Sequence, residues 1–564
     1  MRPRTNPVRR LPALMAGAML LLSGGCAQQD LYEVPGAPFF RVGRVALPSQ
    51  NEDVASIERT AFVAGGQAGL HAIDFSDPAH PVLLQTVNTL KYSESVAVAR
   101  TFVGHVLQDV ALVVEGTEGI TTYDVTDPSA MTSFNTSTTA VFGNRVYVDQ
   151  PDDPEAPFVA YLAESWKGVR VFESLPAQPG ILAYNGVFVG TNGYAEGIVV
   201  RDGWGYVADD EMGLAVLDLR ILDLNAVNLA SWCDSPGDAL DIDLEGDCAF
   251  IADGAAGLAV FRIDAGATPV HLAELPLEGT CRAIAVRDGL AVLAAQGSGV
   301  HFVDVRDPAH PVFLGRVITD YAMDLCFSRE GLLLVVDRDE GLIVLQGDRP
   351  FADATAPAAV TSLEAAPWGA GAVRLTWHAT GDDRFEGTAA AVEVRRADVA
   401  ITDAAAWEAA TPVPGAPLPA TPGTLQEFVV DGLAADPVPH FAVRLRDAAG
   451  NLGALSNDAS AAPGEGILLV DPRLDIQGGT AATTYTWDVT YVYADEPTVH
   501  DVVIDGTPHA MQAVAAKDGG VLYRYAGSLP VGDHAWTLRF AVADAGVPEA
   551  GIAERTGPIV GRLA

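Results

Sequence analysis

The feature that most constrains this chain is a glycine-centred unit that occurs seven times. The segment from Ala249 to Phe261 reads AFIADGAAGLAVF, and the segment from Ala61 to Ile73 reads AFVAGGQAGLHAI, with the same pattern of apolar residues. The key glycines are Gly69, Gly119, Gly168, Gly213, Gly257, Gly299 and Gly341, spaced 50, 49, 45, 44, 42 and 42 residues apart, and Leu, Ile or Val follows each. Such a period is typical of one supersecondary unit copied along the chain.

Each copy predicts four short strands. In the fifth copy these are residues 240–244, 249–252, 258–262 and 270–277, and Gly257 can take the positive φ that a tight turn needs. Four strands in each unit of 42–50 residues predict a seven-bladed β-propeller over residues 37–349. The absence of a sustained 3.6-residue period excludes stacked helix pairs.

The two ends of the predicted ring are expected to meet. The segment 39–45 resembles the fourth-strand segment 312–317, yet it precedes the first unit. The last unit lacks a fourth strand of its own. We therefore expect the N-terminal segment to complete the last blade and to remove an exposed sheet edge.

Several phrases resemble the LVIVD repeat family of bacterial surface propellers. IDFSDPAHP, which ends at Pro81, returns almost unchanged as VDVRDPAHP, which ends at Pro311, and VTDP is a partial copy that ends at Pro128. Val207-Ala-Asp209 and Gly257-Leu-Ala-Val260 also fit that family. The resemblance covers about residues 37–349 and implies a fold, but no particular function.

The repeat pattern ends before the linker 350–356, and the sequence after the linker has a different pattern. Residues 357–463 resemble a fibronectin type III domain, with Trp377 expected in its core. Residues 464–564 alternate apolar and polar positions and resemble an immunoglobulin-like sandwich. The predicted fold class is all-β, a seven-bladed β-propeller followed by two β-sandwich domains.

The N-terminus has the pattern of an export signal. Four arginines precede an apolar stretch at 11–22, and Leu-Ser-Gly-Gly leads into Cys26. This predicts a lipoprotein signal peptide at 1–25, lipidation of Cys26 and a linker at 26–36. The expected location is the cell envelope, as an outer-membrane-anchored lipoprotein or at the cell surface, with secretion as the alternative.

The charge of the chain limits the kinds of molecule that it can bind. A formal net charge of −39 disfavours nucleic acid and anionic lipid, so membrane contact is expected only through the lipid anchor. We expect a monomer.

Because an exported protein permits disulfides, Cys233 and Cys248 are predicted as a pair, whereas Cys281 and Cys326 are expected to be small buried residues.

No catalytic motif is present in the sequence. It contains no GxSxG, HExxH or phosphate-binding glycine loop, so we predict no catalytic residues and no enzyme. His80 and His310 occupy equivalent positions before a proline, which favours a shared turn role over a metal site.

The candidate binding site comes from aligning the repeats. Four residues before the key glycine, five of the seven copies carry a carboxylate, interrupted at Gly65 and Ala295. Such a ring would bind Ca²⁺ or another cation, and Ca²⁺ is the one cofactor considered. The alternative is that each carboxylate caps its own turn. The five are Glu115, Glu164, Asp209, Asp253 and Asp337.

Two further acidic stretches have simpler interpretations. Residues 241–247 alternate Asp or Glu with apolar residues and predict a strand that is polar on one side. Asp382 and Asp383 are expected in a solvated loop. The earlier repeat units are longer and have extra residues at 101–109 and 149–157. If one side of the propeller's binding face differs in function from the rest, we expect the difference in these loops.

These observations favour a non-enzymatic envelope or surface protein that presents its propeller for binding a protein or a glycan, in adhesion or scaffolding. Two alternatives stay open. One is an extracytoplasmic enzyme of the hydrolase, lyase or dehydrogenase class, and the other is a purely structural envelope protein.

Overall fold

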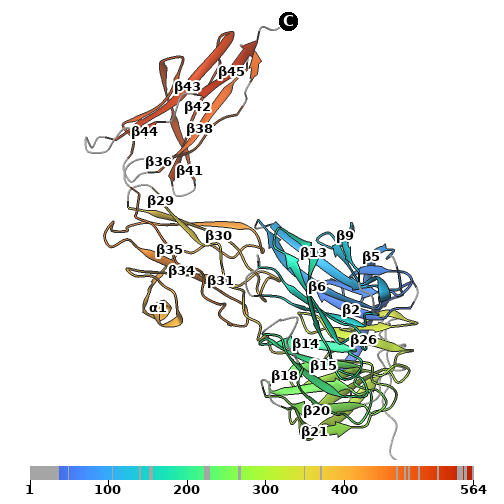
Figure 1. Cartoon of the computed structure of the whole chain (residues 1–564). Coiled ribbons are helices and arrows are strands. Elements are labelled where there is room, and N and C mark those ends of the chain that lie inside the picture. The colour runs from blue at the N-terminus through green and yellow to red at the C-terminus, as the bar shows by residue number, and fades with distance from the viewer. Residues whose placement is uncertain are drawn as a thin grey trace, which may run out of the picture.

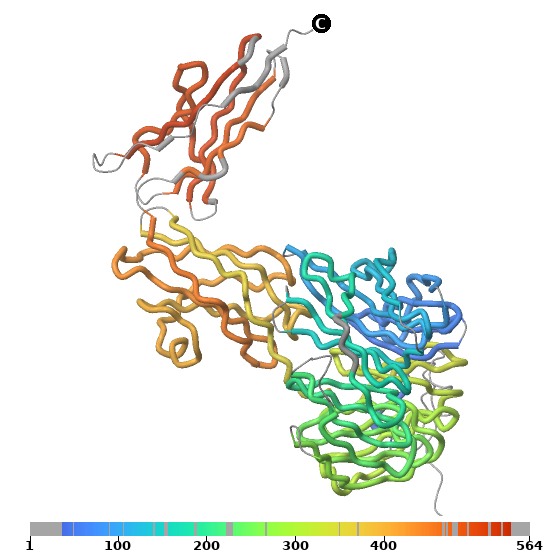
Figure 2. The backbone as a smooth tube through the Cα atoms, viewed as in Figure 1, coloured from blue at the N-terminus to red at the C-terminus, as the bar shows by residue number. Residues whose placement is uncertain are grey.

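The computed structural model describes most of the chain in three successive all-β units (Figures 1 and 2). It describes residues 37–561 except 49, 90, 105, 139–141, 152–155, 221–228, 265–267, 349, 369–370, 465–467, 476–477, 481–482, 493–495, 518–519, 543–549 and 552–554. The predicted signal peptide, the linker 26–36 and Cys26 lie outside the described residues. No helix in the described part is long and apolar enough to cross a membrane.

The first unit consists of seven four-stranded antiparallel sheets, six of which are built from consecutive strands. Sheet 1 contains β2 (Asp53–Ile57), β3 (Thr60–Ala64), β4 (Leu70–Asp74) and β5 (Val82–Val87), and sheet 2 contains β6 (Ser95–Val103), β7 (Val106–Val114), β8 (Ile120–Asp124) and β9 (Thr132–Ser137). Sheet 3 contains β10 (Arg145–Asp149), β11 (Val159–Ala163), β12 (Val169–Leu175) and β13 (Gln178–Val189), and sheet 4 contains β14 (Gly197–Arg201), β15 (Trp204–Ala208), β16 (Leu214–Asp218) and β17 (Leu229–Cys233). Sheet 5 contains β18 (Asp241–Glu245), β19 (Cys248–Ala252), β20 (Leu258–Arg262) and β21 (Val270–Leu275), and sheet 6 contains β22 (Ala283–Arg287), β23 (Leu290–Ala294), β24 (Val300–Asp304) and β25 (Val312–Val317).

Sheet 7 joins the two ends of this unit. It contains β26 (Ala322–Phe327), β27 (Leu333–Asp337) and β28 (Gly341–Gly347), and its fourth strand is β1 (Phe39–Val45). Strand β1 pairs antiparallel with β28, from Phe39 opposite Gly347 to Val45 opposite Leu342. The predicted closure by the N-terminal segment is therefore confirmed.

The seven sheets form a closed ring around their first strands. Each first strand contacts that of the next sheet, from β2 through β6, β10, β14, β18 and β22 to β26, and β26 contacts β2 again. Apolar side chains fill the space between neighbouring sheets, as where Ile251 and Phe261 of sheet 5 pack against Tyr206 and Val216 of sheet 4. We call the space enclosed by the first strands the central channel.

Steric constraints explain why the key position of each repeat is a glycine. Gly257 has a φ of +97°, and a Cβ atom there would lie 2.4 Å from the carbonyl oxygen of Leu275, at the end of the outermost strand of the same sheet. Gly341 has a φ of +91°, and its Cβ would lie 2.3 Å from the oxygen of Val45 on β1. The turn therefore needs both the left-handed backbone and the missing side chain.

The predicted disulfide is wrong, because Cys233 and Cys248 are both free thiols. Cys248 starts β19 and packs with Phe250 between sheets 5 and 6. Cys233 packs with Ala249 and Ile251 between sheets 4 and 5. Successive strand residues point to opposite faces of a sheet, so sheet 5 itself separates the two sulfur atoms.

The second unit consists of a three-stranded and a four-stranded sheet around one core. The first contains β29 (Glu364–Pro367), β30 (Val373–His378) and β33 (Leu425–Val430), and the other contains β32 (Thr411–Val413), β31 (Ala391–Ala397), β34 (His440–Arg446) and β35 (Ala459–Ser460). The short helix α1 (Ala404–Ala409) lies beside them. Trp377 is fully buried in the shared core, as predicted.

The third unit also packs two sheets on an aromatic core that contains Trp487 and Trp536. One sheet contains β36 (Leu468–Leu474), β38 (Tyr485–Val492), β42 (Gly520–Gly527) and β41 (Gln512–Lys517). The other contains β37 (Gly478–Thr480), β45 (Arg555–Gly561), β43 (Gly532–Ala541), β39 (Val499–Ile504), β40 (Thr507–Ala510) and β44 (Ala550–Gly551). Figure 1 shows the second unit against the ring and the third unit beyond it.

Candidate functional site

A belt of polar side chains links the first strands around the channel. In each sheet the belt position is the first residue of the inner strand, or its equivalent after the irregularity in β26. At four of these positions, in Asp53, Ser95, Asp241 and Asp324, the side chain accepts a hydrogen bond from a backbone N–H of the next sheet, as from Val96 N to Asp53 Oδ2 at 2.9 Å and from Val54 N to Asp324 Oδ2 at 3.0 Å. The other three positions hold Arg145, Gly197 and Ala283. The inner strands have an unpaired edge, so these bonds satisfy backbone N–H groups that the sheets leave free. The second of them joins sheet 7 to sheet 1.

Arg145 crosses the channel at the level of this belt. Its guanidinium contacts Asp324 at 2.5 Å and Asp53 at 3.3 Å, and it also pairs with Asp241. Burial opposes the charge on Arg145, but the three carboxylates outweigh it and raise the arginine pKa well above its usual value. Burial, and then the charge of Asp53, raise the pKa of Asp324, although Arg145 opposes this. Arg145 therefore closes the throat of the channel.

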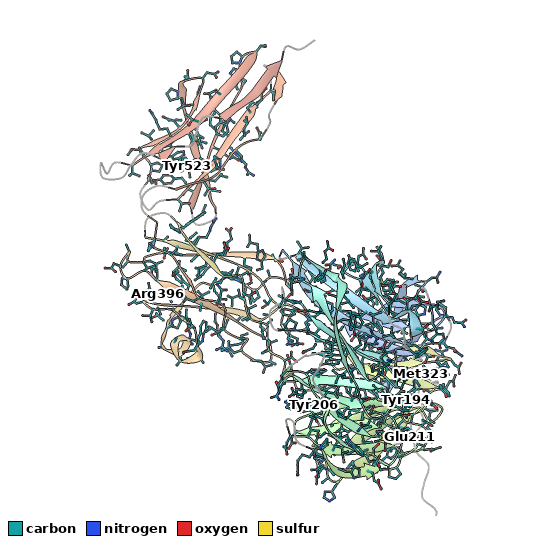
Figure 3. All side chains as sticks on the ribbon, viewed as in Figure 1. Tyr194, Tyr206, Glu211, Met323, Arg396 and Tyr523 are labelled. Atoms are coloured by element: carbon teal, nitrogen blue, oxygen red, sulfur yellow. The ribbon has the colours of Figure 1, made fainter. Side chains whose placement is uncertain are left out.

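The mouth of the channel is formed by the residues directly before the belt. They surround a small cavity of about 50 Å³, large enough for a few water molecules or one cation. All nine residues lining the cavity belong to the ring, and Figure 3 labels one of them, Met323, on the side away from the second unit. The mouth residues are Glu52, Glu94, Asn144, Glu196, Leu240, Arg282 and Met323.

The three glutamates of the mouth differ in their partners. Glu52 accepts from Arg338 at 3.0 Å and from the hydroxyl of Tyr92. Glu94 and Glu196 make no side-chain hydrogen bond or ion pair within the described residues. Burial raises the pKa of each to about 7, and Glu52 adds to the effect at Glu94. Two poorly compensated carboxyl groups beside a small opening can hold a cationic group.

The predicted ring of five carboxylates does not converge. All five side chains are buried, and each holds a connection within or beside its own sheet. Asp253 accepts from Ser235 Oγ at 2.6 Å and from Gly237 N at 2.9 Å, in the connection that enters sheet 5. Asp209 likewise accepts from Asn192 N at 3.1 Å and Gly193 N at 2.8 Å. These two are positioning residues for the connections between sheets.

The remaining three members have partners in their own sheets or in the connections that enter them. Asp337 accepts from Asp339 N and Glu340 N, both at 2.9 Å, so it caps its own turn as the alternative predicted. Glu164 pairs with Arg170, and Glu115 accepts from Lys91 N at 3.2 Å. The interpretation as a Ca²⁺ ring is wrong, because the second strand of each sheet stands behind the inner strand and its end does not reach the channel.

Histidines fill the two interruptions of that ring. His71 lies beside Gly65 in sheet 1, and His301 holds the equivalent place in sheet 6, where Ala295 interrupts the ring. Both imidazoles are buried, and burial lowers the pKa of each to about 4, so they are neutral. Sequence reasoning missed these residues, although both stand two places after a key glycine.

The exposed histidines have the predicted turn role. His80 Nδ1 lies 2.9 Å from Asp77 Oδ2, and His310 Nδ1 lies 2.9 Å from Asp307 Oδ2. Each hydrogen bond stays within one turn, and the two turns are built alike. The prediction of a structural role is confirmed.

The second unit covers the opposite end of the channel. Phe385 is buried against Phe102 and Ala358, and Arg100 donates to the carbonyl oxygen of Phe385 at 3.2 Å. A cavity of about 490 Å³ remains there, lined by residues of the ring, the linker and the loop 383–386. The long hairpin at 101–109 thus meets the second unit and does not extend the mouth. Part of 149–157 lies outside the described residues.

Four segments of the ring match the protein-family model described as the LVIVD repeat. They are residues 50–89, 192–229, 236–269 and 278–319, and they fall on sheets 1, 4, 5 and 6. The chain therefore contains four LVIVD repeats, consistent with a repeat-based, propeller-like protein. The unmatched sheets are those with a long hairpin (β6–β7), a long outer strand (β13) or a strand from the N-terminus (β1).

No curated protein matches the chain. Among solved structures, the crystal structure of the computationally designed Ika8 protein matches at 9% identity and a TM-score of 0.38, covering 54% of this chain and 99% of that chain. A similarity of this size carries no argument about function.

Proposed function

We propose that this chain is a non-enzymatic cell-envelope protein that presents a seven-bladed β-propeller for binding a protein or a glycan. The observation that carries the proposal is the mouth of the central channel, where Glu94 and Glu196 make no side-chain hydrogen bond or ion pair among the described residues and only Arg282 and Arg338 partly offset their charges. The opposite end is covered by the second unit. A partner would therefore meet the ring at the mouth.

The fold assignment rests on the closed circle of inner strands and on β1 as the outer strand of sheet 7. We assign residues 357–463 to a fibronectin type III-like domain on the two sheets that enclose Trp377. We assign residues 464–564 to an immunoglobulin-like sandwich on the aromatic core around Trp487. These two domains would serve as spacers or as further binding modules.

The chemistry of the mouth favours a cationic group on the partner. Arg145 closes the channel below it, so a ligand enters only a short way. A lysine or arginine side chain, or the amino group of a glycan, would pair with Glu94 and Glu196 and keep both ionised. Function on a propeller depends on such a site and not on the fold itself.

The export pattern before Cys26 and the net charge of −39 support an extracytoplasmic, lipid-anchored monomer that avoids nucleic acid. The proposal requires that Cys26 carries the anchor. Secretion without an anchor is the alternative location.

The test is a binding screen with the chain from residue 26 onward, carrying Cys26→Ser to keep it soluble. Glycans and purified envelope proteins are the probes. A binder found with the wild type should lose about tenfold affinity or more with the double variant Glu94→Gln and Glu196→Gln, because both carboxylates are removed. Glu274→Gln, on the exposed outer strand β21, is the matched control and should bind normally. A binder equally tight for all three proteins would exclude the mouth as the site.

The enzyme alternative is favoured by one observation, the convergence of Arg145 and three aspartates in the throat. The mouth cavity has no histidine among its lining residues, and its 50 Å³ holds no polymer substrate. Turnover in a screen of hydrolase, lyase and dehydrogenase substrates, lost in Arg145→Ala, would support that alternative. A screen with neither binder nor turnover would favour a purely structural role.

A further inference from the structure

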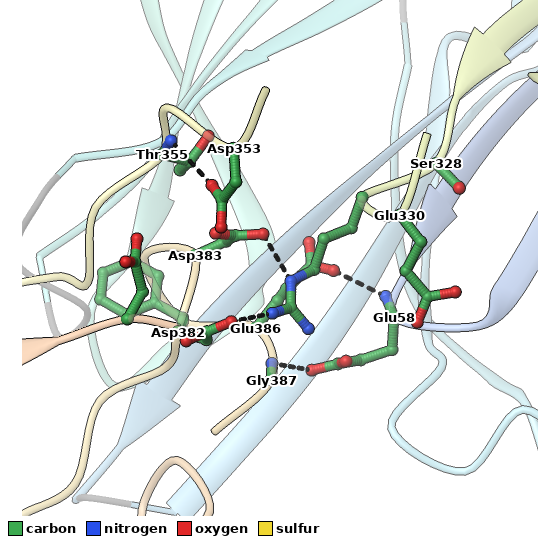
Figure 4. Close-up of polar contacts among 12 residues, drawn as sticks. Glu58, Ser328, Glu330, Asp353, Thr355, Asp382, Asp383, Glu386 and Gly387 are labelled. Carbon is green, nitrogen blue, oxygen red and sulfur yellow. Dashed lines mark hydrogen bonds and ion pairs between the residues drawn. The ribbon is translucent and has the colours of Figure 1, made fainter. Parts of the chain in front are cut away.

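The contact between the ring and the second unit is strongly acidic. Arg329, in the turn between β26 and β27, pairs with Asp382 and Asp383 of the second unit. Glu386 accepts from Glu58 N at 2.7 Å, and Gly387 N donates to Glu58 at 2.8 Å (Figure 4). The aspartates that were expected in a solvated loop are therefore part of a buried contact.

Three carboxylates from separate segments meet beside Arg329. Oxygen atoms of Asp353, in the linker, Asp383 and Asp447, which follows β34, all lie within 4.8 Å of one another. Calcium binds oxygen at 2.3–2.6 Å, so two ligands of one ion are at most about 5 Å apart. The three oxygens thus have the spacing of ligands around a single Ca²⁺.

A fourth carboxylate, that of Asp382, precedes Asp383 in the chain and also pairs with Arg329. Asp382 is only 8% exposed, and its Oδ1 has no hydrogen-bond partner, while Oδ2 is taken by Arg329. Burial raises the pKa of Asp382, and the charges of Asp447 and Asp353 act in the same direction, whereas Arg329 opposes them. Asp383 repeats the arrangement, with Oδ2 on Arg329 and a buried Oδ1 left without a partner.

Such an arrangement is costly without a further cation. A buried acceptor without a hydrogen bond destabilises the fold, and here two occur on neighbouring aspartates that share one guanidinium. The loop that supplies Asp447 is itself fixed, because Asn451 donates to both oxygens of Asp447 at 2.7 Å and to the carbonyl oxygen of Asp353 at 2.9 Å. The carboxylates are therefore held in place before any ion arrives.

We infer that this junction binds one Ca²⁺ ion through Asp353, Asp383 and Asp447, and that the ion fixes the second unit against the ring. The donors are all oxygens, which favours a hard cation over zinc or copper. The irregular set from three segments suits Ca²⁺ better than Mg²⁺, which demands near-octahedral geometry. Arg329 binds Oδ2 of Asp382 and Oδ2 of Asp383, which leaves the other oxygen of Asp383 for the ion. This inference is independent of any partner at the mouth.

Isothermal titration of the chain from residue 26 onward, stripped with EDTA and carrying Cys26→Ser, tests the site with CaCl₂ and MgCl₂ as probes. We expect one Ca²⁺ per chain, weaker Mg²⁺ binding and a rise in Tm with Ca²⁺. Asp353→Asn removes the least buried ligand and should weaken Ca²⁺ binding about tenfold or more while the metal-free Tm stays unchanged. Asp383→Asn should weaken it further.

The control variant Glu94→Gln with Glu196→Gln should bind Ca²⁺ like the wild type, which separates this site from the mouth. Hydrogen exchange of the loop 380–387 should slow when Ca²⁺ is added to the wild type, and this readout remains available if Asp383→Asn folds poorly. Extracellular Ca²⁺ sites have dissociation constants of up to about 1 mM. The inference is overturned if the chain binds no Ca²⁺ at a concentration of about 10 mM, tenfold above that value. It is equally overturned if Asp353→Asn and Asp383→Asn bind Ca²⁺ as tightly as the wild type.

Discussion

The imidazole of His71 occupies the space that a side chain on Gly65 would need, since a Cβ atom on Gly65 would lie 2.2 Å from Nε2 of His71. In sheets 2, 3, 4, 5 and 7 the position of Gly65 holds a carboxylate, and that of His71 holds Thr, Arg, Ala or Ile. Each sheet thus places at least one polar group behind its turn.

This relationship predicts a specific incompatibility. Gly65→Asp should destabilise the ring by about 2 kcal/mol, because two side chains would share one site. His71→Ala in the same chain should recover part of that loss. Urea denaturation of the single and double variants measures the coupling. Gly297→Asp, at an open turn position with no atom within 4 Å of the added Cβ, is the control and should cost little. Additive effects of Gly65→Asp and His71→Ala would contradict this explanation.

The buried aspartates should behave as structural groups. Asp253→Asn should lower the free energy of unfolding by about 1–3 kcal/mol, because an NH₂ group replaces one of the two oxygens that accept from Ser235 Oγ and Gly237 N, and that donor loses its acceptor. The neighbouring exposed Asp234→Asn should change it little. Thermal and urea unfolding give the comparison. If Asp253→Asn has wild-type stability, its carboxylate is not holding the connection between sheets.

The mouth should make stability depend on pH. Glu94 and Glu196 have pKa values of about 7 in the folded chain, above the usual value of about 4.3 in an unfolded one. The folded state therefore favours their protonated form, and their contribution to stability is present at low pH and lost as the pH rises from about 4.3 through 7.

When the pH is raised from 5 to 8, the Tm of the double variant Glu94→Gln and Glu196→Gln should therefore fall by less than the Tm of the wild type. Asp243, whose pKa burial also raises to about 7, is kept in both proteins and cancels in the difference. Calorimetry across this range gives the two slopes. Parallel slopes would mean that the two glutamates ionise normally.

The thiols should be reduced in the folded protein. Cys233, Cys248, Cys281 and Cys326 are all free, so a reducing agent should leave the Tm unchanged. In the Cys26→Ser chain, a thiol reagent in denaturant should titrate four groups. Two titrated thiols and a Tm that falls on reduction would restore the disulfide between Cys233 and Cys248.

The strands could be predicted from the sequence because their signals are local. Alternation at 241–247 predicted the strand that the structure shows as β18, and the likeness of 39–45 to 312–317 predicted the pairing of β1 with β28. Gly257 needed a positive φ in a turn, and the structure confirms it.

The candidate sites were harder, because they depend on distances across the ring and between units. The position of Asp253 along its strand was evident, but not that the inner strand separates it from the channel. Arg145 meets Asp53, Asp241 and Asp324 only because the ring curves them together. Asp383 and Asp447 meet because two loops of the second unit turn toward the linker. Aligning the residue before each inner strand would have revealed Glu94 and Glu196.

The pairing of β1 with β28 also sets the order in which this protein can mature. Phe39 is among the first residues of the ring to be synthesised, and its partner Gly347 is among the last. The edge of β1 therefore stays unpaired in its final sheet until the whole ring sequence has been synthesised. Contacts of such long sequence separation form slowly, so we expect assembly of the ring to be a late, all-or-none event that no shorter product can complete.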